Sequence, residues 1–145
     1  MAGGPIYLVP FNQTPASVRG LEVALQLAAA EKNARVHVVY VVVVNRRLPL
    51  DAEIPDLTGI GERCMSDAEH LARTYKVACE GDILQAREAG HAIVDEAVEL
   101  GAQMIVLGVE RNAPEGAALN LGKTAEYVLR HAPCAVLVVQ REDRT

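Results

Sequence analysis

Five apolar segments recur along the chain, separated by longer segments in which apolar residues return at helical spacing. The apolar segments are rich in β-branched residues, which favours β-strands. One of them, VHVVYVVVV, has no polar alternation, as expected of a strand covered on both faces in a parallel sheet. Strands are predicted at residues 6–11, 36–44, within 77–87, at 103–109 and at 135–139.

The segments between the strands predict helices. Thr14 is placed to cap the first helix and Pro15 to occupy its first position. An apolar stripe at intervals of three and four then continues until Asn33 ends the pattern. Further helices are predicted at residues 56–75, at 92–100 and from 122 to 131.

The helix at 92–100 separates two kinds of residue. Gly90 is expected to break the preceding strand before this helix begins. Apolar residues such as Ile93 are expected to face inward, whereas Asp95, Glu96 and Glu99 are expected to face water.

Strands and helices in this order predict an α/β fold, a single open parallel sheet with helices on both faces. Ligands of such sheets bind beyond the carboxyl ends of the strands, where the strand order reverses. If the first strand neighbours the fourth, the loops after Phe11 and Leu107 line that crevice. No internal repeat competes with this picture, so residues 1–145 are expected to form one domain.

Composition narrows the class of protein. The formal net charge is −5, without a cluster of Lys and Arg that would suit nucleic-acid phosphates, so no nucleic-acid partner is expected. No stretch reaches the roughly 18 apolar residues of a membrane helix, and the N-terminus has no signal pattern. We therefore expect a cytoplasmic protein without membrane insertion. Three widely spaced cysteines, without C-x-x-C spacing, favour free thiols over a disulfide framework or a zinc site, and no metal-binding residues are predicted.

One loop carries a candidate phosphate motif. The stretch GAALNLGKT, residues 116–124, resembles the phosphate loop G-x-x-x-x-G-K-[ST] of nucleotide hydrolases. Five residues separate Gly116 from Gly122, however, where that motif needs four. The strand that should precede the loop also ends several residues earlier, near Val109. A hydrolase phosphate loop is therefore excluded.

Nearly the whole chain resembles a universal stress protein domain. The resemblance is carried by YLVPFNQTPAS, VVYVV, AIVDEAVELGAQMIVLG and, most specifically, LGKTAEYVLRHAPCAVLVV. It implies a five-stranded, Rossmann-type sheet of the adenine nucleotide alpha-hydrolase-like kind, in the order 3-2-1-4-5. It also implies a homodimer paired through the last strand, here residues 135–139, and a family divided into members that bind ATP or AMP and members that do not.

The binding members of that family carry G-x2-G-x9-G-[ST] after the fourth strand and an Asp at the end of the first. Gly108 and Gly122 match the first and third glycines, and Val41 matches the second-strand position whose backbone contacts adenine. The site residues that the resemblance implies are Pro10, Asn12, Val41, Leu107, Gly108, Arg111, Gly122, Lys123 and Thr124.

Three positions depart from that motif. Arg111 brings a Cβ where glycine allows close backbone approach, so this longer loop must take a different path, in which Gly116 could supply the bend. Lys123 replaces a small hydroxyl residue, although the helix start favours an anion whatever its side chains. Two interpretations of Lys123 and Arg111 stay open. Their positive charges could attract the phosphate in place of the lost backbone amide contacts, or both side chains could be solvated loop charges. Asn12 replaces the Asp. It can form a hydrogen bond with a ribose hydroxyl, or it can simply shape the turn. Because Asn is neutral and a poor ligand for Mg²⁺, the protein alone is not expected to hold this ion.

The resulting hypothesis is a regulatory, homodimeric domain that binds ATP, AMP or cyclic di-AMP and is not an enzyme. The alternative is an interaction module that binds no nucleotide. Similar domains occur as cytosolic tails of amino-acid and cation transporters, and LPLDAEIP and QAREAGHAIVDEA resemble these, which would place the chain at the cytosolic face of a membrane beside a transporter partner. Slow ATP hydrolysis is a third hypothesis, but His37 and His131 lie in structural contexts and no catalytic grouping is evident.

Overall fold

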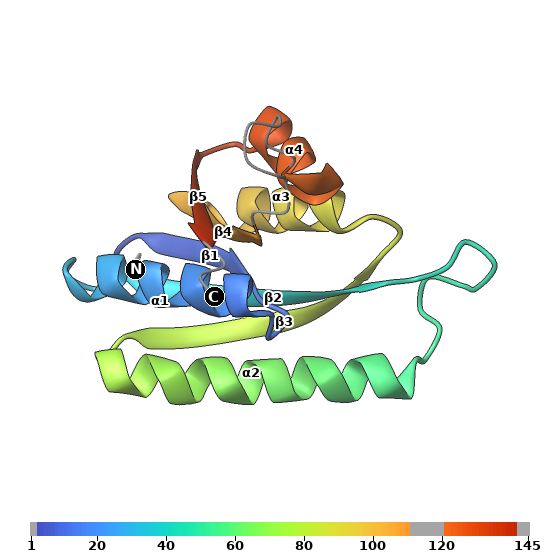
Figure 1. The fold of residues 1–145 in the computed structure, drawn as a ribbon, viewed down its shortest axis with the longest axis horizontal. Helices are drawn as coiled ribbons and strands as arrows, with labels where there is room; N and C mark the ends of the chain where they lie inside the picture. Colours follow the sequence, from blue (N-terminus) through green and yellow to red (C-terminus); the bar gives the residue numbers. More distant parts are fainter. Residues whose placement is uncertain (1–2, 111–120, 142–145) are drawn as a thin grey trace.

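The computed structural model describes residues 3–110 and 121–141. Strands and helices alternate in this part of the chain as the sequence predicts (Figure 1). The elements are β1 (Ile6–Pro10), α1 (Pro15–Ala29), β2 (Arg35–Val43), α2 (Pro55–Tyr75), β3 (Ala78–Ala86), α3 (Ala89–Leu100), β4 (Met104–Glu110), α4 (Gly122–His131) and β5 (Ala135–Arg141).

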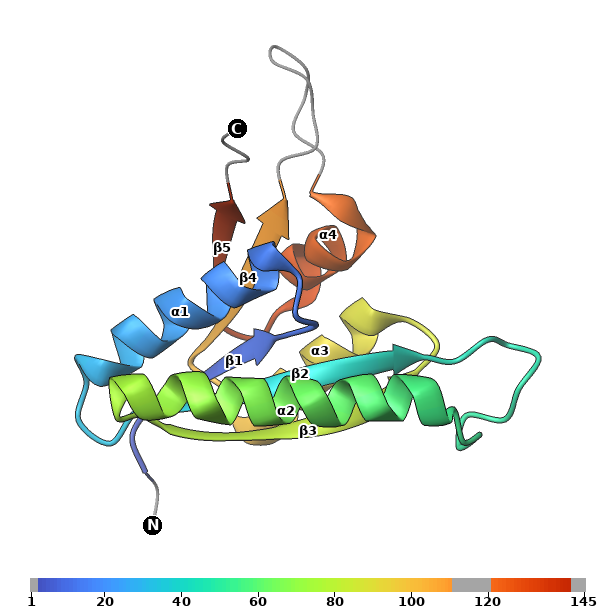
Figure 2. The same ribbon diagram turned by 60° about the horizontal axis from the view of Figure 1, so that its bottom comes forward.

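The strands form one parallel sheet in the order β3-β2-β1-β4-β5, which confirms the predicted topology. β2 stays paired with β3 over its whole length, whereas β1 pairs with β4 only at Tyr7↔Met104 and Leu8↔Ile105. Beyond Leu8 the two central strands separate, and Figure 2 shows β4 and β5 turned steeply away from β2 and β3. A crevice therefore opens at the carboxyl end of the sheet, at the point where the strand order reverses.

Two helices cover each face of the sheet. α1 and α2 bury one apolar cluster, to which Leu21, Leu25 and Cys64 contribute. α3 and α4 bury the other, which includes Ile93 and Val128. In Figure 1, α3 and α4 lie above the sheet and α2 lies below it. The central strands are thus covered on both sides, as their unbroken apolar runs predict.

The start of α1 agrees with its predicted cap. Thr14 is the N-cap residue, its hydroxyl accepts a hydrogen bond from the Ser17 amide at 3.2 Å, and Pro15 follows at the first helical position. The helix ends earlier than the apolar stripe suggests, at Ala29. Asn33 lies beyond it in a left-handed conformation, with a φ of +61°, and helps to turn the chain into β2.

Two predictions for α3 are wrong. Gly90 does not break the chain before the helix but lies in its first turn, where an added Cβ would come within 3.0 Å of Tyr127. Gly90 therefore permits the close packing of α3 on α4. Glu96 does not face water: it is only 8% exposed, because its carboxylate turns toward His37 beneath the helix.

β5 is an edge strand of the sheet. Pairing of residues 135–139 with a second copy, through this strand, stays a prediction.

The cysteines agree with the expectation from the sequence. Cys64, Cys79 and Cys134 are free thiols, and burial raises the pKa of Cys64 and of Cys79 to about 11. Among the described helices, none combines the length and the apolar character needed to span a bilayer.

Candidate functional site

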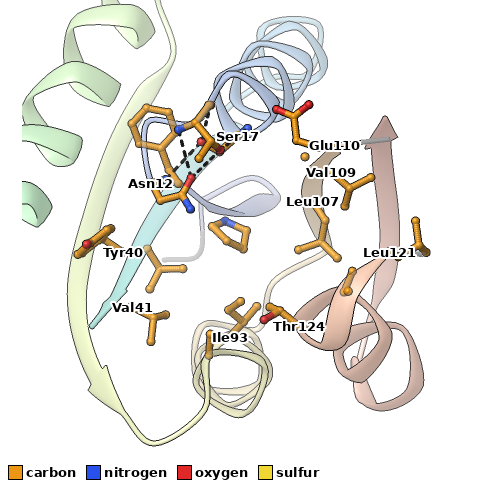
Figure 3. A pocket seen from close by; sticks show the side chains of 18 residues that line it. Asn12, Ser17, Tyr40, Val41, Ile93, Leu107, Val109, Glu110, Leu121 and Thr124 are labelled. Atoms are coloured by element: carbon orange, nitrogen blue, oxygen red, sulfur yellow. Dashed lines mark hydrogen bonds between the residues drawn. The ribbon is translucent and has the colours of Figure 1, made fainter. Parts of the chain in front are cut away.

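A cavity of about 530 Å³ lies at the carboxyl ends of β1, β2 and β4 (Figure 3). The N-terminal turns of α1, α3 and α4 complete its walls. This volume falls within the about 300–1,000 Å³ of small-molecule sites. The lining residues are Pro10, Phe11, Asn12, Thr14, Ser17, Val39, Tyr40, Val41, Ala89, Ile93, Leu107, Gly108, Val109, Glu110, Leu121, Gly122, Thr124 and Ala125.

Asn12 follows β1 and shapes the turn into α1. Its side-chain oxygen Oδ1 accepts hydrogen bonds from the Thr14 hydroxyl at 2.7 Å and from the Thr14 amide at 3.2 Å. Its backbone amide donates to Ser17 Oγ at 3.3 Å. With Oδ1 engaged by Thr14, the amide nitrogen is the part of the side chain that points into the cavity (Figure 3). Asn12 therefore offers a hydrogen-bond donor to a ligand.

Gly108 borders the cavity, but packing behind the cavity requires a glycine there. A Cβ on Gly108 would lie 1.9 Å from the backbone oxygen of Ala16 in α1. Gly20 has the reciprocal relation, since its Cβ would lie 2.9 Å from the backbone nitrogen of Gly108. The axis of α1 thus crosses β4 at a distance that only two glycines allow. The glycine at position 108 has an explanation that involves no ligand.

The start of α4 forms the opposite wall. Gly122 has a φ of +87°, which L side chains rarely adopt, whereas an added Cβ would meet no atom of the described chain within 4 Å. The N-cap residue, Leu121, makes no capping hydrogen bond through its side chain. The first turn of α4 borders the cavity through Gly122 and Thr124, so the positive end of the helix dipole acts on it. This wall favours an anion.

Comparison with known proteins decides the family. The model of the universal stress protein family matches residues 6–140, almost the entire chain. The chain belongs to this family.

Three individual universal stress proteins resemble this chain in sequence or in fold. Universal stress protein Sll1388 of Synechocystis sp. (strain ATCC 27184 / PCC 6803 / Kazusa) is 41% identical over 64 residues, which cover 44% of this chain and only 40% of Sll1388. A solved universal stress protein family member from Burkholderia pseudomallei is 28% identical, with a TM-score of 0.71 over 92% of this chain and 94% of that one. The universal stress protein from Archaeoglobus fulgidus in complex with dAMP is 22% identical, with a TM-score of 0.73 over 95% and 98% of the two chains.

All but two of the predicted site residues line this same cavity of the universal stress protein. They are Pro10, Asn12, Val41, Leu107, Gly108, Gly122 and Thr124. Lys123 is exposed and does not belong to the described lining. Arg111 and the rest of the lengthened loop up to residue 120 lie outside the described residues, so their predicted contacts stay predictions.

One acidic side chain also borders the cavity of this universal stress protein. Glu110, at the end of β4, lies with its carboxylate 3.8 Å from the guanidinium of Arg141 on β5. The register of the sheet causes this contact, because the two residues are direct partners in the ladder. Arg141 offsets part of the charge that Glu110 would direct against an anionic ligand.

Sequence reasoning missed the contributions of α1 and α3 to this site. Ser17 is 5% exposed; its hydroxyl donates to the Thr14 carbonyl at 2.9 Å and accepts from the Asn12 amide. Ala89 and Ile93 enter the lining from the start of α3. The order of strands and helices could have predicted these residues. Each helix that follows a strand of a parallel sheet begins at the carboxyl edge, so the first residues of every helix are candidates for the cavity lining.

Proposed function

We propose that this universal stress protein binds an adenine nucleotide in the cavity between β1, β4 and α4, as a regulatory ligand. The observation that carries the proposal is the combination of a recess at the strand ends, with apolar side chains such as Ile93 and Leu107 in its walls, and the start of α4 on its opposite wall. An adenosine phosphate has two parts that match these features: a flat base that fits the recess, and an anionic phosphate that suits the start of α4. The Archaeoglobus fulgidus neighbour, whose fold is the same, is in complex with dAMP.

The end of β2 supplies polar backbone groups for the base. The Phe11 amide donates to the Val39 carbonyl at 2.9 Å, so Val39 directs its backbone toward β1. Val41 lies two residues further along β2 and faces the same side, past Pro10, the last β1 residue in the ladder. Its N–H and C=O can therefore pair with the acceptor and donor on the edge of adenine. Ile93 and Leu107 provide apolar walls for the ring.

The phosphate end is assigned to the start of α4. The amide groups of a first helical turn and the helix dipole stabilise an anion, typically by about 0.3–1 kcal/mol for the dipole at an exposed site. The Thr124 hydroxyl faces the cavity and can donate an additional hydrogen bond (Figure 3). The Asn12 amide nitrogen lies on the α1 side, where a ribose oxygen can accept from it.

We infer binding without hydrolysis. Asn12 is neutral and its oxygen is already engaged by Thr14. A Mg²⁺ ion held by the protein would need carboxylate or free carbonyl oxygen ligands, and the one described carboxylate at the border of the cavity, that of Glu110, already lies 3.8 Å from the Arg141 guanidinium. Nucleotide binding should therefore persist in EDTA, and incubation with ATP should release no phosphate above the buffer control.

The test is titration calorimetry and thermal melting of the purified protein with AMP, dAMP, ATP and cyclic di-AMP, with GMP as the control for base recognition. We expect saturable binding and a raised melting temperature with at least one adenine nucleotide and no response to GMP. Acid extraction followed by chromatography shows whether nucleotide copurifies. The absence of any response at millimolar adenine nucleotide, from protein with native circular dichroism, would overturn the proposal and favour the interaction module.

A further inference from the structure

A second group of polar side chains lies between the sheet and α3. His37 comes from β2, Asp82 from β3 and Glu96 from α3, and none of them lines the nucleotide cavity. His37 and Glu96 are 7% and 8% exposed. The Asp82 side chain is 49% exposed and connects the group to solvent. Three elements that are distant in sequence thus bring a histidine and two carboxylates together.

The distances among these side chains suit one small cation. His37 Nε2 lies 2.9 Å from Asp82 Oδ2 and 3.3 Å from Glu96 Oε2. All three potential ligand atoms lie within 4.8 Å of one another. Zinc bonds of about 2.0–2.1 Å at tetrahedral angles separate two ligand atoms by about 3.3 Å. The two distances from His37 Nε2 are already close to this separation, and the two carboxylate oxygens, no more than 4.8 Å apart, would need to approach each other by at most about 1.5 Å.

The excess of carboxylates over imidazole in this group also favours a bound cation. Even a fully protonated imidazole supplies one positive charge against two carboxylates. Glu99, also on α3, adds a further carboxylate near the group. The neighbouring cation on β2, Arg35, already lies 3.2 Å from Glu80. Buried carboxylates are retained in proteins mainly when paired or bound to metal.

We propose that His37, Asp82 and Glu96 bind one divalent transition-metal ion, with Zn²⁺ as the best match. Imidazole nitrogen with two carboxylate oxygens is a donor set that zinc accepts, whereas Mg²⁺ and Ca²⁺ prefer oxygen ligands throughout. Three protein ligands leave a coordination position on the exposed side, next to Asp82. The bound ion would link α3 to β2 and β3.

The primary experiment titrates the tag-free, EDTA-treated protein with ZnCl₂ by calorimetry. We expect one Zn²⁺ per chain and a higher melting temperature on binding. Glu96→Gln and His37→Gln should each weaken affinity by about 100-fold or more, since even residues behind the ligands contribute about 10- to 100-fold. Asp82→Asn tests the same site from its exposed side, because about half of the Asp82 side chain is exposed.

The chain offers a matched control. His91 Nε2 lies 2.9 Å from Glu88 Oε2, an exposed pair with no third ligand among the described residues. The double variant Glu88→Gln/His91→Gln should bind Zn²⁺ as the unmodified protein does, within about twofold. Glu99→Gln, which removes a nearby charge but no ligand, should cause only a small loss.

Cobalt substitution identifies the ligands directly. Co²⁺ in the site should give visible bands typical of nitrogen and oxygen ligands, and these should disappear in Asp82→Asn. Near-ultraviolet charge-transfer bands would instead assign the ion to a cysteine thiolate and overturn the proposal. Absence of saturable Zn²⁺ binding, or equal binding by the Asp82→Asn and unmodified proteins, would do the same.

Discussion

Gly108 and Gly122 stand on opposite sides of the cavity, and both match glycines of the family motif, but each is needed for a different reason. At the end of β4, a Cβ on Gly108 would lie 1.9 Å from the Ala16 carbonyl oxygen. At the start of α4, a Cβ on Gly122 would have ample room, and the backbone φ of +87° is what requires glycine. The β4 side is fixed by packing and the α4 side by conformation.

Because the two glycines are required for different reasons, they support different inferences about function. Gly108 is required wherever α1 crosses β4 at this distance, so a family member that has lost its ligand would still need it. Gly122 sets the direction in which the chain enters α4, and that direction decides where the first helical amides lie. Gly122 is therefore the better indicator of an anion site, and Gly108 indicates the family fold.

The largest expected effect follows from Gly108→Ala. The clash is with backbone on both sides, which cannot rotate away, so α1 must shift from the sheet. We expect a loss of about 3 kcal/mol or more in the free energy of unfolding, at the upper end of overpacking. Urea denaturation measures it. Gly20→Ala, with a closest approach of 2.9 Å, should show a smaller loss in the same direction.

A Gly108→Ala protein with near-normal stability but weakened nucleotide binding would reverse this interpretation. It would mean that α1 moves easily and that Gly108 serves the ligand. The Gly20→Ala variant distinguishes the cases, because Gly20 lies in α1 and is absent from the cavity lining.

Sequence patterns predicted the fold because its signals are local. Each strand is an apolar run, and the capping pair Thr14 and Pro15 marks the start of α1. The position of the cavity followed from the rule for parallel sheets, and the likeness to universal stress proteins added the individual residues. Local patterns suffice where a residue's role depends on its neighbours in sequence.

The predictions that failed depend on contacts across the fold. Glu96 looks like its neighbours Asp95 and Glu99, and only the position of His37 beneath α3 explains its burial. Gly90 resembles a chain breaker until Tyr127 of α4 is seen against it. The packing role of Gly108 likewise requires the crossing of α1, which no spacing in the sequence encodes.

Gly122→Ala should have a moderate effect. A non-glycine residue in left-handed backbone costs about 1–2 kcal/mol, and relief of that strain would re-orient the first turn of α4. We expect a loss of stability of that size together with weaker AMP binding. Gly101→Ala is the matched control, since Gly101 has a φ of +63° at the end of α3, outside the cavity lining. It should lose similar stability and retain affinity.

Thr124→Val should affect binding more than folding. The substitution keeps the shape of the side chain at the start of α4 and removes the hydroxyl that faces the cavity. A net hydrogen bond of about 0.5–1.5 kcal/mol corresponds to about a threefold to tenfold loss of AMP affinity. Calorimetry should show no comparable loss in Thr58→Val, an exposed position of α2. Unchanged affinity would mean that α4 acts through its backbone alone.

The smallest expected effect comes from the β4 side, through Glu110→Gln. Glu110 borders the cavity next to Gly108, with 34% of its side chain exposed and Arg141 3.8 Å away. Removal of this negative charge should raise AMP affinity by about twofold in low salt, as for other partly exposed charges. The gain should vanish in high salt, because screening acts over about 10 Å at 0.1 M. Glu126→Gln, exposed on α4 and outside the lining, controls for net charge. A loss of affinity in Glu110→Gln would instead show that its carboxylate accepts a hydrogen bond from the ligand, so that the β4 side would contribute chemistry as well as packing.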